Sequence, residues 1–338
     1  MSTEQLNDER AGGSGAVVLS VVIPVFNEEE TLDALRVRLE KTLDELGEPY
    51  EVLFVNDGSS DRTEHLVREF HEANPRLKLL NFSRNFGHQV AVTCGLDHAS
   101  GQAVVVMDGD LQDPPEVLPD LVKRWREGYD VVYAVRQDRK ENVLKRAAYT
   151  TFYRLLHSVS YLDIPLDSGD FSLVDRRVVD VLCSMPERNR FVRGLRTWVG
   201  FRQTGYEYSR EARFAGESKY NMTRLLSLAF DGLVSYSYVP LRLVSNVGLG
   251  VSAVALLYMG YLLMAWTIGD RAIEGWVSTV VIMLFLGGVQ LLSLGVIGEY
   301  VGRIFEEVKR RPQYIVRDAV GMPYVDVARD EPTGGDAT

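Results

Sequence analysis

The chain has 338 residues but only two cysteines, Cys94 and Cys183. Two thiols so far apart form neither a metal-ligand pair nor a disulfide framework, which fits a protein of a reducing compartment. Basic residues are not in excess either, because the formal net charge is −10 and no arginine-rich tract occurs. Since nonspecific binding to nucleic acid needs a basic surface, we expect no nucleic-acid partner.

Glycine-rich phosphate-binding motifs are also missing. No GxGxxG follows the first apolar run, and no GxxxxGK followed by Ser or Thr occurs anywhere. These absences disfavour a dinucleotide dehydrogenase and a P-loop NTPase. Residues 1–16 are polar and glycine-rich and lack the apolar segment of a secretory signal. We therefore expect a disordered N-terminus over these residues.

Short apolar, β-branched runs alternate with helical segments in the first 135 residues. The predicted strands are residues 17–25, 51–55, 77–82, 104–107 and 130–135, and a further short strand is predicted at residues 168–174. Helices are predicted between them, at about residues 28–46, 60–74, 88–99 and 115–127. This alternation predicts an α/β fold built on a parallel sheet with right-handed crossovers.

An acidic loop follows the predicted strand at 104–107. In it, Asp108, Asp110 and Gln112 alternate, so that in extended backbone their side chains point the same way. Two carboxylates this close repel unless a cation or a proton lies between them. Oxygen ligands at the carboxyl end of a strand suit Mg²⁺ or Mn²⁺ carrying a substrate phosphate. A solvated acidic turn has the same local sequence, so the metal hypothesis depends on the rest of the chain.

Other polar residues follow the other predicted strands. They are Pro24, Asn27 and Glu28 after the first strand, Asp57 after the second and Arg84 after the third. Because the carboxyl ends of parallel strands meet at one edge of a sheet, we expect them to lie near Asp108 and Asp110. This arrangement suits a nucleotide held by acidic side chains and a metal ion.

Basic residues between small, flexible ones lie further along the chain. Arg196 belongs to the segment Arg193-x-x-Arg196-Thr-Trp198, and Arg213-x-x-Gly-x-Ser-Lys219-Tyr follows. We select Arg196, Arg213 and Lys219 as candidates for holding substrate phosphates through charge-assisted hydrogen bonds. A surface loop would look the same in sequence. Asp170 adds another acid beside the short strand at 168–174.

Two long segments, residues 243–268 and 276–297, contain no Asp, Glu, Lys or Arg. Each exceeds the roughly 20 residues that cross a hydrocarbon core. A single central charge would cost about 2.5 to 3.5 kcal/mol on insertion, so we predict two transmembrane helices rather than the buried hairpin of a soluble protein. Arg242 and the run Lys309–Arg311 flank the pair, whereas the connecting loop carries only Arg271 as a base. By the positive-inside rule both termini are cytoplasmic.

The sequence thus predicts five parts. They are the disordered N-terminus 1–16, a catalytic α/β domain 17–220, an interfacial amphipathic helix 221–242, a transmembrane hairpin 243–298, and a cytoplasmic basic helix with an acidic tail 299–338. We expect the tail to be disordered after Arg317. A helix over residues 142–161 is amphipathic and basic, and it suits either packing on the core or a membrane interface.

Six stretches together resemble a known family. They are residues 22–29, 55–61, 83–87, 107–115, 168–171 and 216–220, in this order, and they cover about residues 18 to 311. The chain resembles the family 2 inverting glycosyltransferases, in the polyprenyl-phosphate branch that includes dolichyl-phosphate mannose synthases and bactoprenol glucosyltransferases. The two predicted spans are most similar to the second group.

The resemblance implies a GT-A fold, a Rossmann-like domain that binds nucleotide sugars. It implies roles for the residues of the matching stretches: Pro24, Phe26, Glu28, Asp57 and Arg84 for the nucleotide sugar, and Asp108, Asp110 and Gln112 for Mg²⁺ or Mn²⁺ on the donor diphosphate. Asp170 matches the family's candidate base. One departure is the pair His88-Gln89, where many relatives have a lysine and an acid, and we assign His88 no role. Processive synthases carry Gln-x-x-Arg-Trp, which this chain lacks.

The implied reaction transfers a hexose from a nucleotide sugar to a polyprenyl phosphate at the cytoplasmic face of a bacterial plasma membrane, with inversion. UDP-glucose is our best guess for the donor, although GDP sugars remain open. A phosphate acceptor is mostly a dianion near pH 7, so Asp170 is either a base or a positioning residue. One alternative is a hydroxyl lipid acceptor such as diacylglycerol. Another is a nucleotide-sugar-binding membrane anchor without activity. Glycines in the spans permit a homo-oligomer without establishing one.

Overall fold

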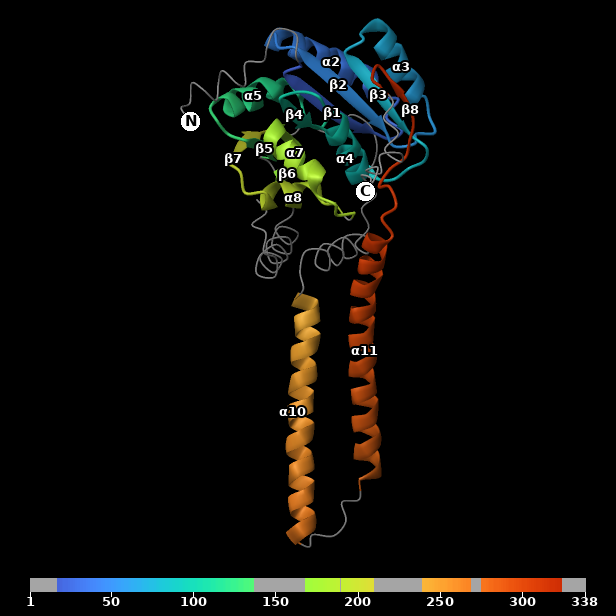
Figure 1. The fold of residues 1–338 in the computed structure, drawn as a ribbon, viewed down its shortest axis with the longest axis vertical. Helices are drawn as coiled ribbons and strands as arrows, with labels where there is room; N and C mark the ends of the chain where they lie inside the picture. The colour runs from blue at the N-terminus through green and yellow to red at the C-terminus, as the bar shows by residue number, and fades with distance from the viewer. Residues whose placement is uncertain (1–16, 137–167, 189, 210–238, 269–274, 324–338) are drawn as a thin grey trace, which may run out of the picture. The chain divides into compact units, whose positions relative to one another are not determined.

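The computed structural model describes residues 17–136, 168–188, 190–209, 239–268 and 275–323 (Figure 1). The chain divides into two compact units. The first unit contains the described residues up to 209 together with residues 311–323, and the second contains residues 239–268 and 275–310.

The first unit is built on one eight-stranded sheet. Its strands are β1 (Leu19–Val25), β2 (Tyr50–Asn56), β3 (Leu77–Phe82), β4 (Ala103–Val106), β5 (Val131–Arg136), β6 (Ser168–Asp175), β7 (Gln203–Tyr208) and β8 (Val316–Val320), in the spatial order β7-β5-β6-β4-β1-β2-β3-β8. Strands β4, β1, β2 and β3 are parallel, as predicted. The sheet as a whole is mixed, because β6 runs antiparallel to β4 and β5, and β8 antiparallel to β3.

Helices cover both faces of this sheet, as Figure 1 shows. They are α2 (Leu32–Leu46), α3 (Thr63–Ala73), α4 (His88–His98), the short 3₁₀ helix η1 (Pro115–Val117), α5 (Leu118–Arg126), α7 (Arg176–Ser184) and α8 (Val192–Trp198). Buried side chains of α2, α3 and α5 form one core layer, and those of α4, α7 and α8 form the other. The α/β prediction is therefore confirmed.

Side chains of the central strands point alternately to the two faces of the sheet and so contribute to both core layers. Val21 and Ile23 of β1 belong to the layer under α2, whereas Val22 between them belongs to the layer under α4. Gly95 lets α4 approach the sheet closely, because a Cβ at this position would come within 2.1 Å of Val22 Cγ1. The N-terminal end of α4 is thereby held near the carboxyl ends of the strands.

The segment after residue 310 returns to the sheet. Tyr314 stacks on Phe82, with ring centroids 5.5 Å apart, and donates a hydrogen bond to Asp97 at 2.9 Å. Asp318 pairs with Arg68 and accepts from Asn81. The prediction of disorder after Arg317 is therefore wrong for residues 318–320, which belong to β8, and Asp318 among them finds partners on α3 and β3. Residues 324–338 lie outside the described residues.

The second unit consists of two long helices that contact each other, α10 (Val239–Ile268) and α11 (Trp276–Val308). At 1.5 Å per residue, their 30 and 33 residues span about 45 and 50 Å. Within the described residues, one stretch is long and apolar enough to cross a membrane, Phe285–Val308, and the apolar stretch Val244–Tyr258 is shorter. Both predicted segments are helical, and the one qualifying stretch among the described residues overlaps the second of them over residues 285–297.

The predicted helix over 142–161 lies outside the described residues. So does the predicted interfacial helix 221–242, except for residues 239–242, which begin α10.

A buried carboxylate joins three parts of the sheet at its amino end. Glu51 on β2 is 2% exposed and accepts hydrogen bonds from Ser20 Oγ at 2.6 Å, from Ser100 N at 2.7 Å and from Lys78 Nζ at 2.7 Å. Burial alone would raise the pKa of Glu51, but these donors outweigh burial and lower it below the ordinary 4.5.

We expect Glu51→Gln to lower the free energy of unfolding by about 2 kcal/mol, because the partly buried Lys78 loses its countercharge and the hydrogen bonds to a buried charge are weakened. Urea denaturation of the detergent-solubilised protein at pH 7 measures the loss. Since the folded pKa is the lower one, the charge stabilises fully above 4.5 and the difference from wild type should shrink as the pH falls below it. Glu45→Gln, at an exposed position, is the control. A difference that persists at low pH would contradict the explanation.

Candidate active site

The predicted site residues gather at one edge of the sheet because of strand order. Strand β6 is antiparallel to β4 with Ser172 opposite Val106, so Asp170 lies beyond the end of β4, beside the loop that begins at Asp108. The loop after β1 and the loop after β2 lie on the other side of β4 in the sheet order. The sheet therefore brings the acid of β6 to the acidic loop from the side opposite to Asp57.

The acidic loop is built into the fold rather than left as a solvated turn. Gly109 O accepts a hydrogen bond from Thr31 Oγ1 at 3.1 Å, and the buried Asp113 accepts one from the Tyr208 hydroxyl. Asp110 Oδ1 accepts from the backbone N–H of Gln112 at 3.1 Å. These bonds fix the loop that presents the alternating polar side chains.

Asp108 begins this loop and has several negative neighbours. Burial raises its pKa, the nearby charges of Asp113, Asp170 and Asp110 raise it further, and His88 only partly opposes them, so that its pKa is about 6. A neighbouring cation would relieve this repulsion.

The donor set fits a divalent cation that shares its ligands with a substrate. In the part of the chain that the structure describes, no three His, Cys, Asp or Glu side chains converge as a closed metal site. Mg²⁺ is usually held by one or two carboxylates together with substrate phosphates. Asp108 and Asp110 supply the carboxylates, and Gln112 supplies an amide oxygen in the same loop.

Asp57 anchors the loop Ser83–Gly87. Its carboxylate, 4% exposed, accepts from Phe86 N at 2.6 Å and from Gly87 N at 3.0 Å. Burial raises the pKa of Asp57 more than these donors lower it. The next residue, Gly58, has φ +71°, and a Cβ there would lie 2.7 Å from the Arg84 carbonyl carbon. Arg84 itself stacks on the Phe86 ring, 4.1 Å from its centroid.

The loop after β1 is tied to the loop after β2. Asn27 N donates to Ser59 Oγ at 3.0 Å, and Glu28 N donates to Thr63 Oγ1 at 2.9 Å. Pro24 is buried at the end of β1, whereas Phe26 is 46% exposed. The ring of Phe26 is therefore exposed in a loop that is held in place, and it is available for a flat ligand group.

Asp170 is surrounded by donors. Arg193 Nε and Nη2 both lie 3.3 Å from its Oδ1, and Gln89 Nε2 donates to its Oδ2 at 3.1 Å. His88 Nε2 lies 3.5 Å from the same Oδ2. Burial raises the pKa of Asp170, but His88, Arg193 and Arg196 lower it well below the usual range.

His88 is a site residue that sequence analysis missed. Its Nε2 lies 3.6 Å from Asp108 Oδ1 and 3.5 Å from Asp170 Oδ2, so one ring nitrogen lies close to both carboxylates. Burial lowers its pKa, but the two carboxylates raise it more. The only signal in the sequence was its position directly after the stretch 83–87, at the start of a helix.

Arg196 is a buried cation in the same region. It is 2% exposed, and its Nε and Nη2 have no hydrogen-bond partner among the described residues. Its guanidinium lies over the Tyr133 ring at 5.5 Å, and burial lowers its pKa to about 10. Arg213 and Lys219, the other predicted phosphate ligands, lie outside the described residues.

The fold and site define an α/β domain that presents carboxylates and arginines at the carboxyl edge of its sheet, an arrangement suited to phosphorylated ligands. Comparison with known families identifies it further. Glycosyl transferase family 2 matches residues 20–183, and the GtrB C-terminal hairpin matches residues 239–304. The chain belongs to glycosyltransferase family 2 and is a glycosyltransferase.

Relatives match over nearly the whole chain. The uncharacterized glycosyltransferase YkcC of Bacillus subtilis is 48% identical over 313 residues, which are 92% of this chain and 97% of the relative. The bactoprenol glucosyl transferase of Shigella phage SfII is 44% identical over 304 residues, 88% of this chain and 97% of the relative. Among solved structures, glucosyl-3-phosphoglycerate synthase from Mycobacterium tuberculosis with UDP has a TM-score of 0.43 at 19% identity, covering 70% of this chain and 84% of that one.

Gly58→Ala tests whether the Asp57 anchor shapes the site. The added Cβ would push on the backbone of Arg84 and Asn85, so we expect the loop Ser83–Gly87 to shift and activity to fall by at least about tenfold. Transferase activity of the purified protein measures the effect. Gly47→Ala is the matched control, since Gly47 has nearly the same φ, +73°, but nothing within 4 Å of its Cβ position. Equal losses in both variants would contradict the role of the loop.

Proposed function

We propose that the protein transfers a hexose from a nucleotide sugar, with UDP-glucose the best candidate, to a polyprenyl phosphate, inverting the anomeric centre. The observation that carries the proposal is that one region of the sheet edge holds both Asp108, whose pKa is raised by burial and neighbouring carboxylates, and the buried Arg196, two of whose nitrogens have no partner among the described residues. The names of relatives 41 to 44% identical, bactoprenol glucosyl transferases and a homologue, support the sugar and the lipid.

The donor occupies the β1–β2 side of the site in this proposal, in a domain of GT-A type. The nucleoside lies among Pro24, Phe26 and Glu28, with the ring of Phe26 available for stacking. Asp57 contributes chiefly by holding the loop Ser83–Gly87, whose Arg84 is exposed near the donor.

The leaving group is a nucleoside diphosphate and develops negative charge as the sugar departs. Asp108, Asp110 and Gln112 would hold Mg²⁺ or Mn²⁺, which when bound supplies several kcal/mol of charge stabilisation without proton transfer. By holding that ion, these residues would also help to orient the diphosphate relative to the acceptor side of the site.

The acceptor phosphate approaches from the β6 side, where Arg193 and Arg196 lie. Arg196 offers N–H donors inside a buried environment, where a charge-assisted hydrogen bond to phosphate is strong. Arg213 and Lys219 are further candidates for phosphate contacts. The phosphate is mostly a dianion near pH 7 and needs no strong base to attack the sugar.

Asp170 is then a positioning residue rather than the base. A carboxylate engaged by Arg193, Gln89 and His88 is a weak proton acceptor. A hydroxyl acceptor such as diacylglycerol would require a base, so the surroundings of Asp170 favour the phosphate acceptor. Its role here is to orient the arginines that receive that phosphate.

Helices α10 and α11 serve as the membrane anchor. We propose that both cross the bilayer, with the loop between them outside and both termini in the cytoplasm. The exposed apolar side chains of α11 and the qualifying stretch Phe285–Val308 support this arrangement. Anchoring places the catalytic unit where a lipid phosphate headgroup is concentrated.

The test uses purified full-length protein in detergent with undecaprenyl phosphate, Mg²⁺ or Mn²⁺, and radiolabelled UDP-glucose, GDP-mannose or UDP-N-acetylglucosamine. We expect acid-labile label in the organic phase from one donor, chiefly UDP-glucose, and none with EDTA. A diacylglycerol arm separates the acceptors, since its product survives mild acid. Label only in that arm, or turnover indifferent to EDTA, would overturn the proposal.

The two acids of the site should differ in importance. We expect Asp110→Asn to reduce the rate by at least 10²-fold, because a metal ligand is lost, and Asp170→Asn to reduce it less, because the dianionic acceptor needs no base. Initial rates at saturating donor and acceptor compare the two. A rate for Asp170→Asn as low as that for Asp110→Asn would contradict the assignment of Asp170.

A further inference from the structure

Gln89, the second residue of α4, joins three elements through one side chain. Its Nε2 donates to Asp170 Oδ2 at 3.1 Å, and its Oε1 accepts from the backbone N–H of Val192 at 3.0 Å. Asp170 belongs to β6, and Val192 is the first residue of α8. The amide therefore connects the carboxylate of the site directly to the helix that carries Arg193 and Arg196.

We propose that Gln89 is a positioning residue of the transferase, which sets the placement of the α8 arginines relative to Asp170. The inference rests on the proposed function, in which these arginines receive the acceptor phosphate. Gln89 itself touches neither reacting atom in this scheme and acts through Asp170 and α8.

The start of α8 depends on an outside acceptor. The first N–H groups of a helix lack partners within it and are usually capped by the preceding residue. Here that residue is Phe191, whose side chain has no oxygen. Gln89 of α4 supplies the missing acceptor from another helix. Since α8 has only seven residues, its position is decided by such contacts rather than by its own stability.

The chemistry of this contact requires an amide. Gln presents a donor group and an acceptor group at the same distance from the backbone, whereas an ionised Glu presents acceptors only and Met presents only a weakly accepting sulfur. An added carboxylate at 3.1 Å from Asp170 would also place two like charges together. Gln89→Glu therefore removes the bond to Asp170 alone, whereas Gln89→Met removes both bonds.

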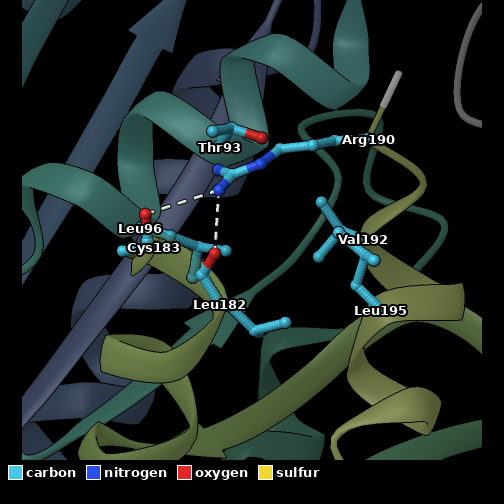
Figure 2. Close-up of a pocket in the computed structure, with 7 residues that line it drawn as sticks. All are labelled: Thr93, Leu96, Leu182, Cys183, Arg190, Val192 and Leu195. Carbon is cyan, nitrogen blue, oxygen red and sulfur yellow. Dashed lines mark hydrogen bonds between the residues drawn. The ribbon is translucent and has the colours of Figure 1, made fainter. Parts of the chain in front are cut away.

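Other contacts keep α8 in place without Gln89. Figure 2 shows Arg190 reaching the carbonyl oxygens of Leu182 and Cys183 at the end of α7, at 2.8 and 3.5 Å. At the other end of α8, Gln203 Nε2 donates to Arg196 O at 2.8 Å. Loss of Gln89 should thus displace the start of α8 without unfolding it.

A matched control lies one turn further along α4. Thr93 lines the small pocket of Figure 2 with Val192, is buried, and its hydroxyl donates only to Gln89 O within the helix among the described contacts. Thr93→Val removes a hydrogen bond of α4 and keeps the bridge between Gln89, Asp170 and Val192.

The experiment compares Gln89→Met, Gln89→Glu and Thr93→Val in full-length, detergent-solubilised protein. We expect Gln89→Met to speed hydrogen exchange at the start of α8 and to raise the KM for undecaprenyl phosphate by about tenfold, the size of one charge-assisted hydrogen bond. The KM for the nucleotide sugar should stay within about twofold, since the donor side is untouched. Gln89→Glu should leave the exchange near wild type but raise the acceptor KM, and Thr93→Val should change neither.

Two results would overturn the inference. One is unchanged exchange at α8 in Gln89→Met. The other is an equal rise of both KM values with a lower melting temperature, which indicates general destabilisation. If the wild type transfers no sugar to undecaprenyl phosphate, the proposed function fails, while the exchange measurement still decides whether Gln89 holds α8.

Discussion

The crowding of carboxylates at the end of β4 is the constraint on which the site depends. Asp108 and Asp170 both lie close to the same imidazole nitrogen, His88 Nε2, yet their pKa values are shifted in opposite directions. Asp170 is compensated by Arg193, Gln89 and His88, and its pKa is low, whereas the pKa of Asp108 stays raised at about 6. On the β6 side, side chains of the protein itself neutralise the carboxylate. In the acidic loop, the negative charge is only partly neutralised. A ligand that brings a cation with it is favoured at that place.

The mixed sheet is what creates this asymmetry. A purely parallel sheet would have placed another loop, rather than the start of β6, beside the end of β4. Because β6 is inserted in reverse between β4 and β5, its first residues meet the acidic loop, and the following α7 and α8 pack against α4 on one face. The arginines of α8 thus reach the site through helix packing, while Asp57 and Glu28 reach it through strand ends.

Sequence patterns predicted the features that depend on residues close together in the chain. The strands β1 to β5 follow from apolar runs, and Asp57, Asp108 and Asp110 follow from their place after those runs. The direction of β6 could not be predicted, because strand pairing is decided by contacts distant in the chain. His88 and Gln89 were missed for the same reason, since their partner Asp170 lies about 80 residues further on. Residues 318–320 were assigned to the acidic tail, but Arg68 and Asn81 bind the carboxylate of Asp318.

The same balance of charge bears on the choice of nucleophile. A transferase that activates a hydroxyl needs a carboxylate free to accept a proton, and such groups are usually held in apolar surroundings that raise their pKa. Asp170 lies in the opposite environment, with a guanidinium at 3.3 Å and an amide at 3.1 Å. Arg196 next to it is buried, and two of its nitrogens have no hydrogen-bond partner among the described residues, so an anionic acceptor compensates its charge, whereas a neutral hydroxyl does not. In the proposed reaction, the acceptor that supplies its own negative charge is therefore the one for which the β6 side of the site is suited.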